Sequence, residues 1–188
     1  MASTTRTDRR AELAKTSYEL IAERGMEGVS LRAVARRLGA TTGLVSHHFA
    51  DRAELTEAAL DHAAAVIVTR VMKMPGSTDV FDVLAAVLPI DAVTIENWRF
   101  AFSVRTSAMF DPDLRRFDRM ILEHWNSYLP GQLAGRVEGD LHDACRHLIA
   151  LVDGIALQAV LNPLDWPADK QIHHLRLGYS ALVTGARQ

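Results

Sequence analysis

Apolar residues recur at spacings of three and four along the whole chain, which is the period of an α-helix. No segment alternates apolar and polar residues over five or more positions, as a half-buried strand would. Prolines and glycines interrupt the pattern and separate its segments. The chain is therefore predicted to be all-α, with about nine helices at residues 8–24, 31–38, 42–49, 51–73, 79–89, 92–110, 113–128, 138–162 and 168–186.

The second and third predicted helices carry the most informative pattern. Apolar residues from Leu31 to Leu38 follow the i, i+3, i+4, i+7 spacing, Ser30 precedes them as an N-cap, and Gly39 ends the helix. The helix that follows is too short to be stable alone. Two short helices joined at a glycine favour a helix-turn-helix, in which the first helix braces the second in a DNA major groove. A plain helical hairpin also fits this spacing.

The third helix offers polar groups on its outer side. Leu44, Val45 and Phe49 are needed to anchor it on its neighbours. The residues then left facing outward are Thr41, Thr42, Gly43, Ser46, His47 and His48. Hydroxyls, imidazoles and a glycine that admits close backbone approach suit contacts with phosphates and base edges.

Composition and charge limit the alternatives. Nothing at the N-terminus resembles a secretory signal, and the single cysteine, Cys145, allows no internal disulfide, so we expect a cytoplasmic protein. The longest apolar run, residues 148–161, contains Asp153 and Gln158 and is expected to be a buried helix, not a membrane span. Residues 1–52 carry nine Lys/Arg against six Asp/Glu (+3) and the remainder twelve against seventeen (−5), which sum to the net −2, so the N-terminal quarter is the basic end.

Residues 25–55, from Gly25-Met26-Glu27-Gly28 through Gly43-Leu44-Val45-Ser46-His47-His48-Phe49 to Leu55, closely resemble the DNA-binding domain of the TetR family of bacterial regulators, and look most like its choline-responsive BetI-type branch. The resemblance implies a DNA-binding domain at 1–52 and a helical ligand-binding and dimerisation domain at 53–188. It further implies a dimeric regulator, expected to be a repressor, that binds a palindromic DNA operator and is released by a small molecule.

The same resemblance implies roles for single residues. Ser30 and Arg52 would bind phosphates, and Arg32 would reach a base. Thr42, Gly43 and Ser46 would face the groove, while His47 and His48 would touch the DNA backbone. Many family members carry a tyrosine where this chain has Ser46, so the phosphate contact of that tyrosine is not carried over.

Two C-terminal segments are candidates for a homodimer interface. Residues 148–161 are apolar on nearly every side, so one face inside the protomer does not account for them. A stripe on the last helix comprises Ile172, Leu175, Tyr179 and Leu182. Together they predict a four-helix interface between two copies, and a helix buried wholly in one protomer is the alternative.

Aromatic and sulfur-containing residues in the middle of the chain predict a ligand pocket. Trp98, Phe102, Arg105 and Met109 share a helical face, and Met120, His124 and Trp125 lie on the next helix. Core packing explains most such residues equally well. The two tryptophans suit a cation, whereas Arg105 favours an anionic or carbonyl-bearing ligand, so choline is not transferred to this chain. Asp153 is a second candidate anchor, and the helix that begins near Arg52 is the expected lever to the DNA-binding unit.

Other functional classes have less support. No nucleophile motif, phosphate-binding glycine loop or metal-protease pairing occurs, so we expect no enzyme, and no cofactor or metal is assigned. A metal- or thiol-responsive sensor would use His142 and Cys145, which share a helical face that His147 does not. A helical interaction module that does not bind DNA is the other alternative.

Overall fold

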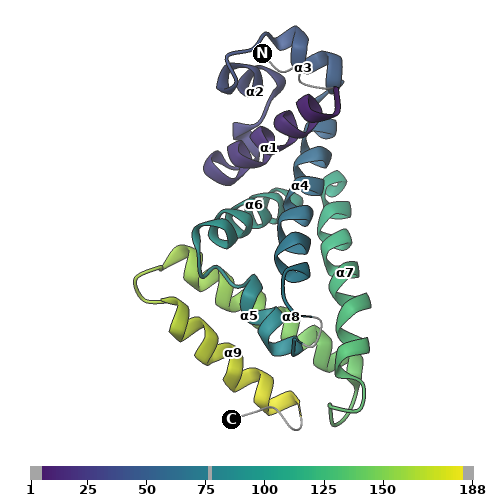
Figure 1. The fold of residues 1–188 in the computed structure, drawn as a ribbon, viewed down its shortest axis with the longest axis vertical. Helices are drawn as coiled ribbons and strands as arrows, with labels where there is room; N and C mark the ends of the chain where they lie inside the picture. Colours follow the sequence, from purple (N-terminus) through teal and green to yellow (C-terminus); the bar gives the residue numbers. More distant parts are fainter. Residues whose placement is uncertain (1–5, 76–77, 184–188) are drawn as a thin grey trace.

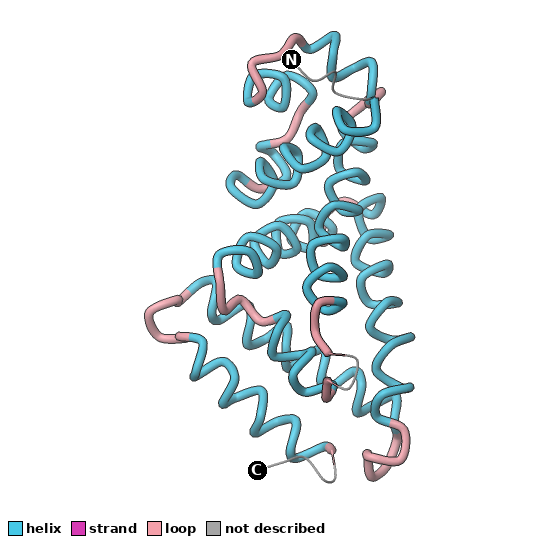
Figure 2. The backbone as a smooth tube through the Cα atoms, viewed as in Figure 1, coloured by secondary structure: helices cyan, strands magenta, loops and turns pink. Residues whose placement is uncertain are grey.

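The computed structural model describes residues 6–75 and 78–183, and within them the chain forms nine α-helices and no strand (Figures 1 and 2), which confirms the all-α prediction. The helices are α1 (Arg6–Arg24), α2 (Leu31–Arg37), α3 (Thr42–His48), α4 (Arg52–Met72), α5 (Val80–Val87), α6 (Ala92–Ala108), α7 (Arg115–Leu133), α8 (Leu141–Leu161) and α9 (Ala168–Leu182). Two 3₁₀ turns, Met26–Gly28 and Pro112–Leu114, were not predicted. Residues 184–186, the expected end of the last helix, lie outside the described residues.

Side-chain caps set most of the helix starts. The Asp51 carboxylate accepts the Glu54 amide at 3.0 Å and the Glu54 carboxylate accepts the Ala50 amide at 2.9 Å, so the two residues form a capping pair at the start of α4. Asp91 likewise accepts the Thr94 amide at 2.9 Å at the start of α6. These bonds satisfy amide groups that a helix start otherwise leaves unpaired.

The predicted end of the seventh helix at residue 128, before Pro130, is wrong. Pro130 lies inside α7, which continues to Leu133, and the proline carbonyl still accepts the Ala134 amide at 3.0 Å. A proline inside a helix removes one hydrogen bond and crowds the preceding turn. Here Leu129 and Leu133 on either side of it are fully buried, and their packing holds the last turn in place.

The helices divide into two packed groups (Figure 1). We call α1–α3 with the first 3₁₀ turn the N-terminal unit; its hydrophobic core also takes in the first half of α4 and two side chains of α6, Phe100 and Val104. A second core joins α5, α7, α8 and α9 at the other end of the molecule. Because α4 and α6 contribute to the first core and also run beside the second, they join the two groups.

Asp79 ties the second group together. Its carboxylate caps α5 by accepting the Phe81 amide at 2.9 Å, pairs with Arg136 at 2.9 Å, and accepts the Tyr179 hydroxyl at 3.2 Å. Burial and the nearby Asp79 charge raise the pKa of Tyr179 to about 12, so this hydroxyl keeps its proton and acts as the donor.

The apolar stripe on α9, predicted to form part of the dimer surface, faces the interior of the protomer. Leu175 and Tyr179 are buried in the protomer's own core, with Ile172 and Leu182 packed against it, because this side of α9 faces α5 and α8. The exposed apolar side chains of this region are instead Leu157, Leu161, Leu164 and Leu177.

By length and composition, α8, which contains the apolar run at residues 148–161, is the one described helix long and apolar enough to cross a membrane. A core helix of a soluble protein passes the same test, so a single such helix is weak evidence of a membrane span.

Candidate nucleic-acid interface and ligand cavity

The helix-turn-helix is built from short-range signals. The Ser30 hydroxyl accepts the Ala33 amide at 3.1 Å and starts α2, whose central residues are buried. Gly39 has φ +62°, a left-handed conformation that glycine adopts without strain, and it turns the chain toward α3. The Thr41 hydroxyl then accepts the Leu44 amide at 3.3 Å and starts α3. Both hydroxyl oxygens are therefore used as caps, although both residues remain exposed.

The outer side of α3 is polar and exposed. Thr42, Gly43, Ser46 and His47 all lie on the surface, whereas Val45 is fully buried beneath them. His48 is half-buried, and its ring contacts that of His47 with 5.4 Å between centroids. The helix thus presents one face of hydroxyl, imidazole and glycine groups, of a width that a DNA major groove accommodates.

The two arginines expected at this surface differ in their surroundings. Arg32 is exposed at the start of α2 and makes no ion pair within the described part of the chain. The Arg52 guanidinium donates to the Met26 carbonyl at 2.6 Å and lies 3.5 Å from the Glu27 carboxylate. A phosphate contact by Arg52 would have to compete with these two internal acceptors.

A third arginine near this surface, Arg10 on α1, was not predicted from the sequence. Its guanidinium donates to the His48 carbonyl at 2.6 Å, and its central carbon lies 4.2 Å from the centre of the Phe49 ring. The positive charge meets the carbonyl end of α3, where a helix dipole favours a cation. No local signal could have shown this contact, because the two residues are 38 positions apart.

A cavity of about 290 Å³ lies between α4, α5, α6, α7 and α8, where the two groups of helices meet. Its walls are largely apolar and include the rings of Trp98, Phe100 and Trp125. This volume is at the lower end of the roughly 300–1,000 Å³ of ligand sites, so it suits a small molecule. Five of the seven predicted ligand residues line it: Trp98, Arg105, Met120, His124 and Trp125.

The other two predicted ligand residues lie elsewhere. The Phe102 ring packs beside Trp98 at 5.2 Å between centroids but does not line the cavity. Met109 follows the last turn of α6 and is 70% exposed. The helical face expected from spacing alone therefore turns away from the cavity at these positions.

Arg105 is not a free positive charge in the cavity wall. Its Nε donates to Asp118 at 2.8 Å, and its Nη1 lies 2.9 Å from the Asp153 carboxylate. Burial opposes its charge, but the two carboxylates outweigh that effect and hold the pKa of Arg105 above its usual value. The expectation of an anionic ligand loses its basis, because both acids already neutralise this guanidinium.

Two further polar residues in the cavity wall carry acceptor oxygens. Asp61 on α4 lines the cavity, and so does Asn97 on α6, whose Oδ1 is buried without a hydrogen-bond partner. A buried unpaired acceptor is costly unless something donates to it. Asn97 lies one turn before Ala101 and two turns before Arg105, so helical spacing already places it on the same face of α6 as Arg105.

Comparison with known proteins matches both halves of the chain. Residues 13–59 match the model of bacterial regulatory proteins of the tetR family, and residues 78–183 match the C-terminal domain of BetI-type transcriptional repressors. The chain belongs to the TetR family. It is 31% identical over 172 residues to the transcriptional regulator BetI of Burkholderia mallei, a match covering 85% of this chain and 87% of that protein.

Solved structures of TetR-type fold agree. A transcriptional regulator from Rhodococcus sp. Rha1 superposes with a TM-score of 0.83 at 26% identity, covering 92% of this chain and 97% of that one. A regulator from Saccharomonospora viridis, solved in complex with choline, superposes with a TM-score of 0.81 at 20% identity, covering 95% and 99%. The relatives are transcriptional regulators and not enzymes, and membership in this family makes the present chain a DNA-binding transcriptional regulator.

The residues of the sensor alternative do not assemble in this TetR-family chain. Cys145 is buried, and that burial raises the pKa of its thiol, whereas His142 on the same helix is exposed. Within residues 6–75 and 78–183, no group of three or more His, Cys, Asp or Glu side chains is arranged to hold a metal ion.

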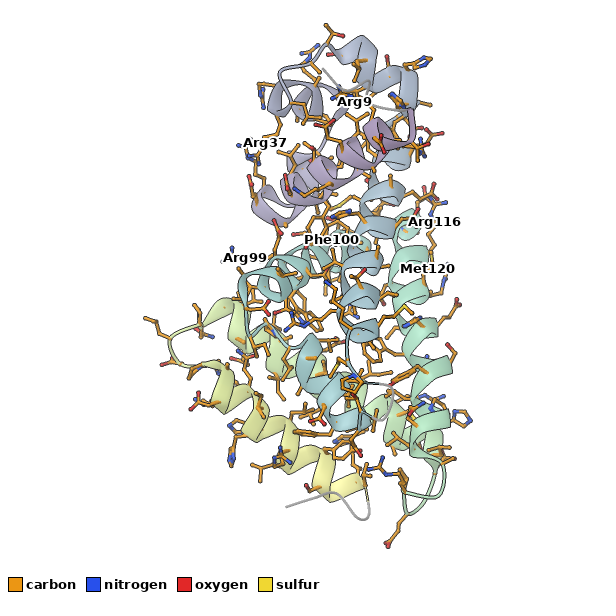
Figure 3. All side chains as sticks on the ribbon, viewed as in Figure 1. Arg9, Arg37, Arg99, Phe100, Arg116 and Met120 are labelled. Carbon is orange, nitrogen blue, oxygen red and sulfur yellow. The ribbon has the colours of Figure 1, made fainter. Side chains whose placement is uncertain are left out.

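One aromatic contact joins the N-terminal unit to the cavity. Phe100, labelled on α6 in Figure 3, lines the cavity and also packs on Tyr18 of α1 with 5.1 Å between ring centroids. Tyr18 contacts His62 of α4 at the same distance. Burial and the nearby Glu96 raise the pKa of Tyr18, and burial lowers the pKa of His62, so both groups are uncharged at neutral pH. The junction is therefore an apolar contact between three helices.

Proposed function

We propose that this TetR-family regulator acts inside the bacterial cell as a dimeric repressor that binds a palindromic operator through two copies of α3 and leaves it when a small organic cation enters the cavity. The observation that carries the proposal is the exposed polar face of α3, seated on a buried brace. Residues 30, 32, 41–43 and 46–48 are the contacts we assign to DNA, with Arg52 as a further phosphate contact.

The dimer is inferred from the C-terminal helices. Leu157 and Leu161 on α8, Leu164 in the following loop and Leu177 on α9 are 41–96% exposed, and so many exposed leucines favour burial against a second copy. In a twofold dimer these same helices meet their equivalents and hold two α3 helices at a defined spacing. Sedimentation of the protein at micromolar concentration is expected to show a dimer, and a stable monomer would refute this assignment.

The effector class is inferred from the cavity. Two tryptophans, a residue type whose ring attracts cations, line it, and the carboxylates of Asp61 and Asp153 outnumber the one guanidinium, Arg105. The choline held by the regulator from Saccharomonospora viridis is a small quaternary ammonium of this kind. We infer that the present cavity takes a cation of similar size.

The test is a gel-shift titration, at fixed salt, on DNA from upstream of the protein's own gene. Arg32→Ala is expected to weaken binding by about 1–3 kcal/mol, as for loss of a base-reading arginine. Arg36→Ala is the matched control, because Arg36 is exposed on the same helix but borders a hollow between α1 and α2. Equal losses in both variants would remove Arg32 from the proposed contacts.

Release is tested in the same assay with choline and its neutral carbon isostere, 3,3-dimethyl-1-butanol. Because the two differ in charge and little in shape, choline alone is expected to dissociate the complex. Release by both compounds to the same extent would contradict a cation-selective cavity.

A further inference from the structure

The side chain of Arg105 joins three helices at the wall of the cavity. It projects from α6 and bonds Asp118 of α7 through Nε and Asp153 of α8 through Nη1. The Arg105 side chain is 18% exposed and the Asp118 and Asp153 side chains 35% and 33%, so water screens these bonds less than it screens fully exposed ion pairs. Of the two carboxylates, Asp153 lines the cavity and Asp118 does not.

The Arg105–Asp153 bond connects the two parts of the molecule that must communicate. On one side, α6 carries Phe100, which packs on Tyr18 of α1 in the N-terminal unit. On the other side, α8 carries Leu157 and Leu161 of the proposed dimer interface. A change in how α6 is held on α8 therefore changes how the N-terminal unit is held on the dimer.

A cation in the cavity competes with Arg105 for Asp153. Removing one partner of an ion pair that is shielded from water is costly when the other charge is left without a partner. That cost is absent here, because Asp118 keeps the guanidinium paired and the incoming cation keeps Asp153 paired. The exchange of one cation for another leaves every charge compensated.

We propose that Asp153 is the counter-ion of the cationic effector and that its bond to Arg105 is the contact that the effector weakens, which loosens α6 from α8 and shifts the spacing of the two N-terminal units. The inference rests on the cationic effector proposed above. It assigns to one carboxylate both the recognition of positive charge and the start of the change in DNA affinity.

The experiment compares Asp153→Asn with Asp118→Asn. Each removes one charged partner of Arg105, but only the first removes a carboxylate from the cavity. Calorimetric titration with choline is expected to show at least a tenfold loss of affinity in Asp153→Asn and a smaller loss in Asp118→Asn, where the cation has to compete with an Arg105 that has no second carboxylate partner. Thermal unfolding of both variants checks that each is folded.

Operator binding gives the second measurement. Because Asp153→Asn weakens the α6–α8 bond without any ligand, its affinity for DNA is expected to fall at least fivefold, within the range usual for coupling between sites. Choline should then lower it no further, while Asp118→Asn, which keeps the Arg105–Asp153 bond, should bind DNA as the unmodified protein does and still be released, at a higher choline concentration.

Three results would overturn the inference: unchanged choline affinity in Asp153→Asn, equal effects of the two substitutions, or no binding of either choline or tetramethylammonium to the unmodified protein. Failure of the proposed function is distinguishable from these. Calorimetry requires no DNA, so a chain that binds no operator still shows whether Asp153 is the counter-ion.

Discussion

Replacing Arg10 by alanine should weaken operator binding although Arg10 lies on α1 and not on α3, the helix proposed to contact DNA. Helix α3 has seven residues, fewer than an isolated helix needs for stability in water, so its position depends on tertiary contacts. Arg10 supplies two of them, the hydrogen bond to the His48 carbonyl and the stacking of its guanidinium on Phe49. The substitution leaves the buried side chains of α3 in place and removes only these contacts.

The magnitude follows from the two contacts. A hydrogen bond from a charged donor stabilises a protein by about 1.5 kcal/mol at the lower end of its range, and this lower value suits the solvent-exposed bond of Arg10. The guanidinium of the exposed Arg10 over the Phe49 ring adds about 0.5–1 kcal/mol. We therefore expect Arg10→Ala to cost about 2 kcal/mol in the seating of α3, and operator affinity at fixed salt to fall by up to about thirtyfold.

Arg9→Ala is the control for this prediction. Arg9 carries the same charge on the same helix, but its guanidinium pairs with Glu12 one turn away and not with α3. Gel-shift titration of both variants at two salt concentrations separates the loss of a positive charge from the loss of the α3 contact. If the two arginines weaken binding equally, the effect is one of charge, and the proposed seating of α3 by Arg10 is refuted.

Three further predictions concern stability and are measured by urea or thermal unfolding. Asp79→Ala should lower the free energy of unfolding by about 2 kcal/mol at neutral pH, because a helix cap and a charged hydrogen bond are lost together. Burial would raise the pKa of Asp79, but its hydrogen bonds and ion pair hold that pKa below the ordinary 3.8. The stabilisation by Asp79 is therefore present above pH 3.8 and disappears as the pH falls through the lowered pKa. An Asp79 variant equally destabilised at neutral and strongly acidic pH would contradict this reasoning. Tyr18→Phe should leave stability unchanged or raise it by up to about 1 kcal/mol, because the hydroxyl is buried without a partner, and a clear loss would reveal a bond to that hydroxyl. Gly131→Ala, in open space on a helix, should stabilise the protein by up to about 1 kcal/mol, and Gly178→Ala should gain clearly less than this or lose stability, because its added carbon would lie 2.3 Å from the Leu151 side chain, which must move aside.

Much of the fold follows from signals within a few residues. Ser30, Asp51 and Asp91 start helices by accepting amides three positions ahead, and Gly39 turns the chain at positive φ. The exposed polar face of α3 also follows from spacing, because each turn of a helix places the same side outward. The helix end predicted before Pro130 was wrong, because the burial of the leucines around Pro130 outweighed the local effect of the proline.

The cavity and its charges required the tertiary structure. Spacing placed Trp98 and Arg105 on one side of α6, but the partners of Arg105 lie 13 and 48 positions away, on helices whose packing no local pattern specifies. For the same reason the sequence did not show that two carboxylates neutralise Arg105, which had favoured an anionic or carbonyl-bearing ligand. Nor did it show that the stripe on α9 faces the protomer's own core. By itself the sequence determined the helices and the outer face of α3, because hydrogen bonds and caps within a turn or two specify them. Only the fold decided which charges meet, because burial removes water from some pairs and leaves others exposed.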